Sequence, residues 1–165
     1  EPVGDEFAVG EDATRASANP VVLAVGSGFG IYWSQHEATL SRNWNVYGRV
    51  FASAGNPSSA PTLINVHTAG DQFAPRAAAS GAAQFVVWTS LGQDGSREGV
   101  YGRALVNGLP VGDELQVNTT TPSRQYQPVV AGAGSGKYLT VWSGYAGATS
   151  FDLYSQVFET NAAER

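Results

Sequence analysis

Cysteine and methionine are both absent from the 165-residue sequence, and only 14% of the residues are charged. Without cysteine, neither a disulfide nor a thiolate metal site can form. Because translation begins at methionine, a chain that starts at Glu1 is expected to be a processed product or a piece of a larger protein. No apolar run approaches the roughly 18 residues that a membrane-spanning helix requires, so membrane insertion is not expected.

Positive charge is scarce as well. Nine Lys and Arg residues stand against 14 Asp and Glu residues, which gives a net charge of −5 and an isoelectric point near 4.9. Proteins that bind nucleic acid present clustered Lys and Arg side chains, and the sequence contains no such cluster. Nucleic acid is therefore excluded as a partner. Sparse charge together with many Gly, Ser, Thr, Val and aromatic residues is typical of secreted bacterial β proteins.

Four landmarks recur three times in the same order, with a period of about 54 residues, which lies in the range that marks repeat architectures. Each unit has a proline, then a run ending in tryptophan, then a run containing tyrosine. A fourth segment follows in the first two units, at 55–66 and 108–118, and its third copy stands at the N-terminus as "EPVGDEFAVG". The first three landmarks are Pro20, Pro75 and Pro128; Trp33, Trp88 and Trp142; and Tyr47, Tyr101 and Tyr154. We place the repeat units at 11–67, 68–118 and 119–160 of one domain that covers the whole chain.

The landmarks read as strands. Runs such as "FGIYW", "FVVW" and "YLTVW" are β-branched and aromatic and are too short for helices. Clusters of Gly, Asn, Pro and Ser separate them. The sequence therefore predicts an all-β fold with four strands per repeat and no helix.

The third unit lacks its own fourth strand, and the N-terminus carries a spare copy of one. "EPVGDEFAVG" repeats most of "GLPVGDELQVN" (108–118). We expect residues 4–9 to close the last unit by pairing near Leu153–Phe158, since circular β folds hide an open edge in this way. Propeller-like blades fit the unit best, and a β-trefoil or a β-prism is the alternative. A homodimer of three blades each would complete a six-bladed ring.

One family resemblance rests on the repeat motif itself. The pattern G-x-P-x-G-D-E-x-x-V-N (108–118), followed by Gln125 and Pro128, W-x-S at Trp142 and "VYGR" (100–103), resembles the tandem repeats of large secreted bacterial proteins of the RTX and adhesin type. The resemblance implies a propeller-like fold and a secreted or cell-surface location. His67 and Gly10 stand where the motif has Asn118, so a strictly symmetric triple site is not expected.

The repeated tryptophans and tyrosines favour a structural role. Each tryptophan ends the most apolar strand of its unit, which is typical of a residue that fills the core between units. A row of sugar-stacking platforms is the alternative. The repeated strand is therefore interpreted as scaffold.

Function is expected where the units differ, because loops on a rigid frame carry variable chemistry. The connection between the tryptophan and tyrosine strands varies most in sequence and length. Exposed aromatic rings with Asn, Asp and Arg beside them suit a sugar, whose apolar face stacks while its hydroxyls need hydrogen bonds. Solvated hairpin tips are the alternative. The candidate ligand-binding residues are His36, Arg42, Asn43, Trp44, Asp94, Arg97 and Tyr145.

No catalytic motif is recognisable. His36 and His67 are the only histidines, and neither G-x-S-x-G nor H-E-x-x-H occurs. No cofactor is predicted, and Ca²⁺ at the Asp-Gly turn of 92–99 is the one metal left open. The sequence thus predicts a non-enzymatic extracellular module that binds glycans or other copies of itself, with a purely structural spacer or self-assembly unit as the alternative.

Overall fold

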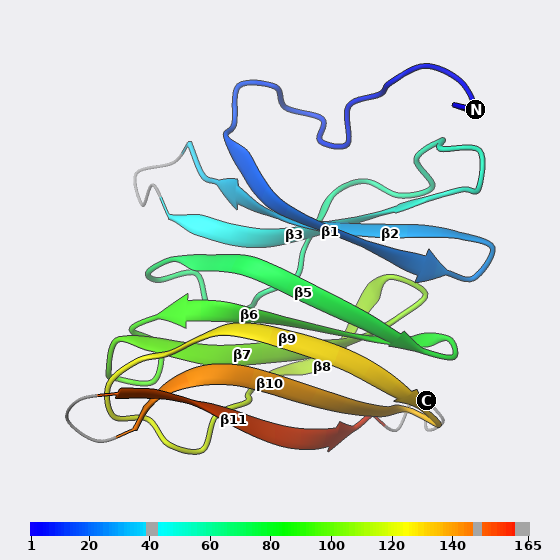
Figure 1. The fold of residues 1–165 in the computed structure, drawn as a ribbon. Helices are drawn as coiled ribbons and strands as arrows, with labels where there is room; N and C mark the ends of the chain where they lie inside the picture. Colours follow the sequence, from blue (N-terminus) through cyan, green and yellow to red (C-terminus); the bar gives the residue numbers. More distant parts are fainter. Residues whose placement is uncertain (39–42, 147–149, 161–165) are drawn as a thin grey trace.

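The computed structural model describes residues 1–38, 43–146 and 150–160. Within these ranges the chain forms eleven strands and no helix, as predicted (Figure 1). No helix long and apolar enough to cross a membrane is found in the described part of the chain. The strands are β1 (Ser17–Val25), β2 (Gly28–His36), β3 (Trp44–Phe51), β4 (Thr62–Leu63), β5 (Gln72–Ser80), β6 (Ala83–Leu91), β7 (Glu98–Val106), β8 (Leu109–Gln116), β9 (Gln125–Gly134), β10 (Lys137–Ala146) and β11 (Ser150–Glu159).

The strands form three antiparallel sheets that stack as consecutive blades (Figure 1). Two sheets have four strands each, in the orders β1-β2-β3-β4 and β5-β6-β7-β8, and the third has the order β11-β10-β9. The first strands of the three sheets lie together, because β5 contacts both β1 and β9. Sequential order within each sheet and adjacent first strands are the arrangement of propeller blades rather than of a trefoil or a prism.

The sheets are apolar on both faces, and this decides how they stack. In β6, Phe85 and Val87 point to one face while Val86 and Trp88 point to the other, and all four are fully buried. A strand with two buried faces reads as a continuous apolar run, which explains the "FVVW" stretch. The middle sheet is therefore covered on both sides.

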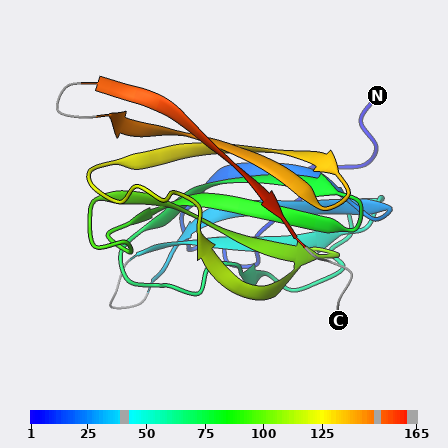
Figure 2. The ribbon, with the colours of Figure 1, turned by 90° about the horizontal axis from the view of Figure 1, so that it is seen from below.

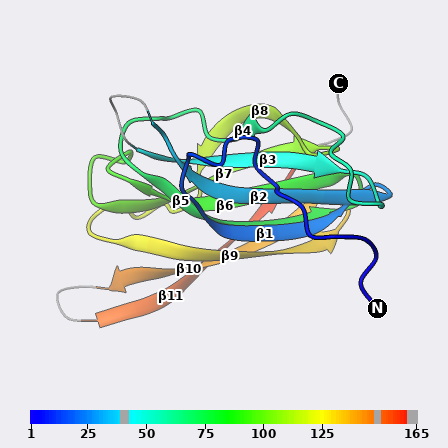
Figure 3. The same ribbon diagram turned by 90° about the horizontal axis from the view of Figure 1, so that it is seen from above.

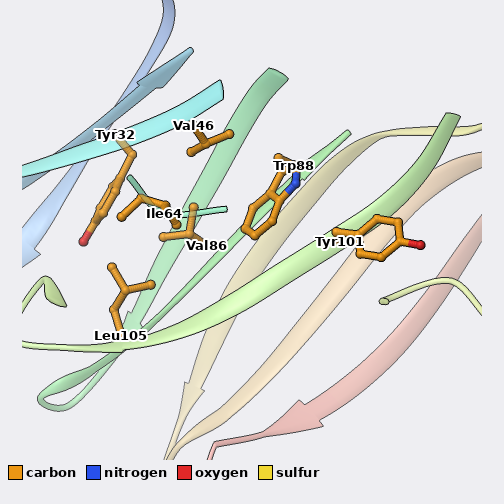
Figure 4. Packing of buried hydrophobic residues seen from close by; sticks show 7 residues of the cluster. All are labelled: Tyr32, Val46, Ile64, Val86, Trp88, Tyr101 and Leu105. Carbon is orange, nitrogen blue, oxygen red and sulfur yellow. The ribbon is translucent and has the colours of Figure 1, made fainter. Parts of the chain in front are cut away.

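The seam between the first and second sheets is one cluster of buried side chains (Figure 4). Trp88 has no exposed surface, and Tyr32 joins the cluster from the first sheet. Figure 4 shows Leu105 reaching toward the same seam from β7. The members are Tyr32, Val46, Ile64, Val86, Trp88, Tyr101 and Leu105.

The seam between the second and third sheets repeats this arrangement. Its buried members are Phe85, Val87, Val100, Val117, Tyr138 and Trp142, with Leu115 and Phe158 packed against them. Trp33 is 3% exposed and Trp142 5% exposed, so all three repeated tryptophans are buried. The interpretation as anchors between units is confirmed for Trp88 and Trp142, whereas Trp33 is buried outside both seams, near Val9 and Gly10 of the N-terminal segment.

Each first strand carries a bulge just before its proline. Asn19, Ala74 and Gln127 have φ angles of 53°, 54° and 54°, which are left-handed conformations that non-glycine residues rarely adopt. A hydroxyl of the preceding sheet holds two of these bulges. The Ala74 N–H donates to Ser34 Oγ at 2.9 Å, and the Gln127 N–H donates to Thr89 Oγ1 at 3.2 Å. These bonds offset the strain and lock each sheet to the one before it.

Two asparagines extend the pairing of the third and fourth strands in the same way. The Val46 N–H donates to Asn65 Oδ1 and the Val100 N–H donates to Asn118 Oδ1, both at 2.7 Å. Asn65 is thus the counterpart of Asn118. The sequence comparison that set His67 against Asn118 was wrong by two residues, because the first unit's connection between β3 and β4 has a different length.

The prediction that residues 4–9 close the last sheet was wrong. These residues form no strand and lie along the outward side of the first sheet (Figures 1 and 3). The Phe7 ring lies 5.7 Å from the Phe51 ring, and Arg49 Nη1 donates to the Val9 carbonyl at 3.0 Å. These contacts place apolar side chains of the N-terminal segment against the first sheet, which is the sheet nearest to it in the chain. The third sheet keeps three strands and an open edge at β11 (Figure 2).

Replacement of Ser34 by Ala should destabilise the fold. The change leaves the Ala74 N–H without its partner in a buried seam, which costs about 1–3 kcal/mol. Urea unfolding followed by far-UV circular dichroism measures the difference. Ser53→Ala, at an exposed turn residue, is the matched control and should leave the free energy of unfolding within about 0.5 kcal/mol of the parent. Equal stability of the two variants would refute the role given to the hydroxyl.

Candidate functional site

The polar side chains of chemical interest gather at one edge of the stacked sheets. This polar edge is formed by the connections from β2 to β3, β6 to β7 and β10 to β11, and by the segments that lead into β1, β5 and β9 (Figure 1). The opposite edge consists of the short hairpins within each sheet. The polar edge therefore holds the variable loops that the sequence singled out.

A compact group of side chains surrounds Trp44, and we call it the Trp44 cluster: His36, Glu37, Asn43, Trp44 and Asp71. The imidazole of His36 meets the indole of Trp44 edge-on, with ring centres 5.4 Å apart, because the two residues face each other across β2 and β3. The backbone N–H of Trp44 donates to Asp71 Oδ1 at 3.1 Å, and the backbone N–H of Glu37 donates to the backbone carbonyl of Asn43 at 2.9 Å. These bonds fix the chain at Trp44 beside Asp71 and hold Glu37 beside Asn43.

The Glu37 carboxylate is the most constrained group of the cluster. Its Oε1 accepts the Tyr47 hydroxyl at 2.6 Å, and its Oε2 pairs with Arg15 Nη1 at 3.1 Å. The Glu37 side chain is 12% exposed. Burial and the hydrogen bond to Glu37 raise the pKa of Tyr47 to about 12. Both carboxylate oxygens therefore receive donors, one of them cationic, and the two bonds hold the carboxylate in place.

The position of Asp71 is set by β5, the strand that begins at the next residue. It directly precedes β5, the first strand of the middle sheet, and is partly buried. Asn43 is anchored to the same connection, since its Nδ2 donates to the Thr68 carbonyl at 3.0 Å. The connection from β4 to β5 therefore fastens the Trp44 cluster across the seam of the first two sheets.

The second sheet contributes Asp94 and Arg97, which lie in the turn between β6 and β7. Asp94 Oδ1 accepts the Ser96 N–H at 3.0 Å, while Asp94 Oδ2 is buried without a hydrogen-bond partner. Arg97 is exposed. Burial, followed by the charges of Asp94 and Glu114, raises the pKa of Tyr101 to about 12. This turn is a polar site separate from the Trp44 cluster.

The third sheet contributes an aromatic group. The Phe151 ring lies edge-on to Tyr145 at 5.0 Å and to Tyr126 at 5.4 Å. Phe151 is 49% exposed. Tyr145 was among the predicted site residues, and Tyr126 and Phe151 were missed.

The structure thus brings together three of the seven predicted site residues: His36, Asn43 and Trp44. Arg42 lies outside the described residues, and Asp94, Arg97 and Tyr145 belong to the other two sheets. Sequence reasoning missed Glu37 and Asp71. The one available signal was their position, directly after His36 and directly before β5. Among residues 1–38, 43–146 and 150–160, no three His, Asp or Glu side chains converge as metal ligands.

No protein-family model matches the chain, and no curated protein matches it by sequence. Several solved structures share its fold. An α-L-arabinanase from Penicillium chrysogenum, solved with arabinobiose, superposes with a TM-score of 0.57 and 10% identity over 85% of this chain and 42% of its own. The catalytic domain of the GH62 α-L-arabinofuranosidase of Coprinopsis cinerea gives 0.56 and 12% identity over 90% and 48%. The endo-arabinase of Bacteroides thetaiotaomicron gives 0.51 and 12% over 87% and 57%.

At these identities the likeness shows the fold, an all-β stack of propeller blades, and the chain spans about half the length of the structures it matches. The likeness also corrects two sequence predictions. The structural neighbours are glycoside hydrolases rather than repeats of RTX or adhesin-type proteins. The prediction of a non-enzymatic binding, display or spacer module is overturned by the same finding. Motif resemblance failed here because the repeated residues build seams, and seams carry no information about activity.

The pKa of Tyr47 predicts a loss of stability at alkaline pH. The folded chain keeps this hydroxyl protonated up to about pH 12, whereas an unfolded tyrosine ionises near pH 10. Stability is therefore complete below about pH 10 and falls as the pH rises toward 12. In urea titrations across this range, Tyr47→Phe should flatten the fall and Glu37→Gln should flatten it partly. An unchanged slope in Tyr47→Phe would contradict the assignment.

Proposed function

We propose that this chain forms part of a carbohydrate-active enzyme that hydrolyses arabinose polymers, with sugar bound at the Trp44 cluster. The observation that carries the proposal is that Trp44, Glu37 and Asp71 gather at the polar edge, where Asp71 accepts the backbone N–H of Trp44. The arabinan-degrading enzymes among its structural neighbours support the choice of substrate class. Arabinose polymers are encountered outside the cell, and we therefore also propose an extracellular location for this enzyme.

The cluster has the groups that sugar recognition needs. The apolar face of a sugar ring packs on an aromatic side chain, and its hydroxyls seek planar donors and acceptors. Trp44 is partly exposed and is held edge-on by His36. Asn43 directly precedes Trp44 in the chain, and the His36 imidazole lies against the Trp44 ring. In our proposal Trp44 supplies the stacking surface, and Asn43 and His36 orient the hydroxyls.

Glycoside hydrolysis commonly uses two carboxyl groups, one to protonate the departing oxygen and one to assist water or to attack the sugar. Water is split in the overall reaction. Its hydroxyl joins the anomeric carbon, and its proton ends on the oxygen that leaves. We assign the role of assisting water or attacking the sugar to Glu37, which accepts bonds from Tyr47 and Arg15. We assign the acid role to Asp71, which accepts the backbone N–H of Trp44.

A binding titration tests the first part of the proposal. Arabinobiose added to the full chain should change the tryptophan fluorescence in a saturable way. Trp44→Ala should weaken binding by at least tenfold, since the stacking of a ligand ring on an aromatic side chain is worth on the order of 1–3 kcal/mol. Trp44→Phe, which keeps an aromatic face, is the matched control and should retain most of the affinity. Equal binding by the Ala variant would place the sugar elsewhere.

Release of reducing sugar from arabinan tests the second part. Glu37→Gln and Asp71→Asn should each lower the rate by more than 100-fold while leaving arabinobiose binding within a few fold. Glu98→Gln, at a carboxylate paired with Arg124 outside the cluster, is the control and should leave the rate unchanged. Hydrolysis that persists in both cluster variants would remove Glu37 and Asp71 from the mechanism.

A further inference from the structure

We propose that two copies of this chain close into one ring, in which the third sheet of each copy docks on the first sheet of the other. In this ring, residues 4–9 of each copy supply the missing fourth strand of the partner's third sheet. The proposal goes beyond the proposed function and does not depend on it. It rests on the two seams inside the chain, which show what each open face requires.

The outward face of the third sheet is apolar and uncovered, and we call it the exit face: Val129, Leu139, Leu153 and Val157. These side chains are 52%, 43%, 71% and 64% exposed. Leu153 occupies the position of Val46 and Val100, since each precedes the repeated tyrosine. Val46 and Val100 are fully buried in the two seams. The exit face is thus a seam surface without its neighbouring sheet (Figure 2).

The outward face of the first sheet has the complementary character, and we call it the entry face: Val22, Phe29 and Ile31. Val22 is 62% exposed and Phe29 is 42% exposed. A hollow of about 360 Å³ lies between this face and the N-terminal segment, lined also by Val3, Phe7 and Phe51. In the second and third sheets the corresponding faces are buried against the sheet before them. The hollow is therefore where the strands of a preceding blade would insert.

The N-terminal segment already stands where the outer strand of that preceding blade belongs. Arg49 donates to the Val9 carbonyl at 3.0 Å, just as Arg103 in the second sheet donates to the Ile64 carbonyl of the first at 2.9 Å. Ile64 ends the outer strand of the first sheet. Val9 thus takes the place of Ile64 one blade earlier.

A second contact repeats in the same register. Phe7 lies against Phe51, as Leu115 of the second sheet packs in the cluster that holds Phe158 of the third. The segment "GDEFAV" (4–9) also repeats "GDELQV" (112–117), which pairs with β7. The open edge of β11 is the counterpart of β7. It is a ten-residue strand with unpaired backbone groups on one side.

The hydroxyl lock supplies a further polar contact. Ser34 and Thr89 accept the bulge N–H of the following sheet, and Ser143 holds the same position in β10. Its acceptor site faces the direction of a fourth sheet. Asn19 carries the one bulge of the three that has no preceding sheet in the chain. Docking would let Ser143 of one copy accept the Asn19 N–H of the other.

A second copy is the occupant that satisfies both faces at once. The entry and exit faces lie at opposite ends of the stack (Figure 1), so a single copy cannot join them. Two copies related by a half turn form two identical seams and a ring of six sheets, which leaves no open face. The N-terminal segment then lies between its own first sheet and the partner's β11.

Light scattering after size exclusion tests the proposal on the full chain. We expect a mass about twice 17.2 kDa that falls toward 17.2 kDa on dilution. Leu153→Asp should give the lower mass at every concentration while keeping the β-sheet circular dichroism spectrum. Leu109→Asp, at an equally apolar residue that is 52% exposed on the second sheet, is the matched control and should keep the doubled mass. A monomer at all concentrations, or an open series of larger assemblies, would overturn the closed pair.

Disulfide cross-linking tests which copy donates the strand. Because the chain contains no cysteine, only the introduced cysteines can form a disulfide. By the pairing of Tyr101 with Gln116, Ala8 should lie opposite Tyr154 of the partner. Ala8→Cys and Tyr154→Cys chains, mixed and oxidised, should form a disulfide-linked pair, and neither variant alone should do so. In a chain that carries both changes, an internal disulfide in a monomer would show that the segment closes its own sheet and would refute the exchange.

Discussion

Every sheet of this protein is apolar on both faces, and each one therefore needs a neighbouring sheet on either side. The middle sheet meets this requirement fully, with Trp88 buried toward the first sheet and Phe85 buried toward the third. The outer two sheets meet it on one side only. This requirement explains the repeat, the burial of the tryptophans and the position of the N-terminal segment, which packs Phe7 against Phe51.

The same stacking determines where chemistry can occur. Because the faces are occupied by seams, the edges alone are free to vary, and one edge consists of short hairpins. The Trp44 cluster lies at the other edge and straddles a seam, with Asp71 from the second sheet bonded to Trp44 of the first. The bond across the seam thus holds the backbone at Trp44 in a fixed relation to Asp71. The site is positioned by the scaffold and is specified by residues that the repeat leaves free.

The fold could be predicted because its buried residues recur in every repeat unit. The site was hard to predict because its residues occur only once. The tryptophans at 33, 88 and 142 recur in register, so strands, units and buried anchors could be read directly. The N-terminal segment was assigned to the third sheet as a strand, whereas it forms no strand and contacts the first sheet, because its contact with Arg49 is not encoded in any pattern. Trp44, Asn43 and His36 stood out as unlike their counterparts. Glu37 and Asp71 did not, since a lone acid in a loop carries no signal of its surroundings.

The left-handed residues before the three prolines have a consequence for how such a chain can change over time. Proline cannot donate to the ladder, and in the second and third units the strained residue before it donates its N–H to a hydroxyl of the sheet upstream. Strand register is thereby fixed at the same point in these two units. A gene that gained or lost one whole unit would carry its own lock with it and would join the remaining sheets in phase. A gain or loss of part of a unit would break the lock, so evolution by whole-unit duplication is the route that this architecture permits.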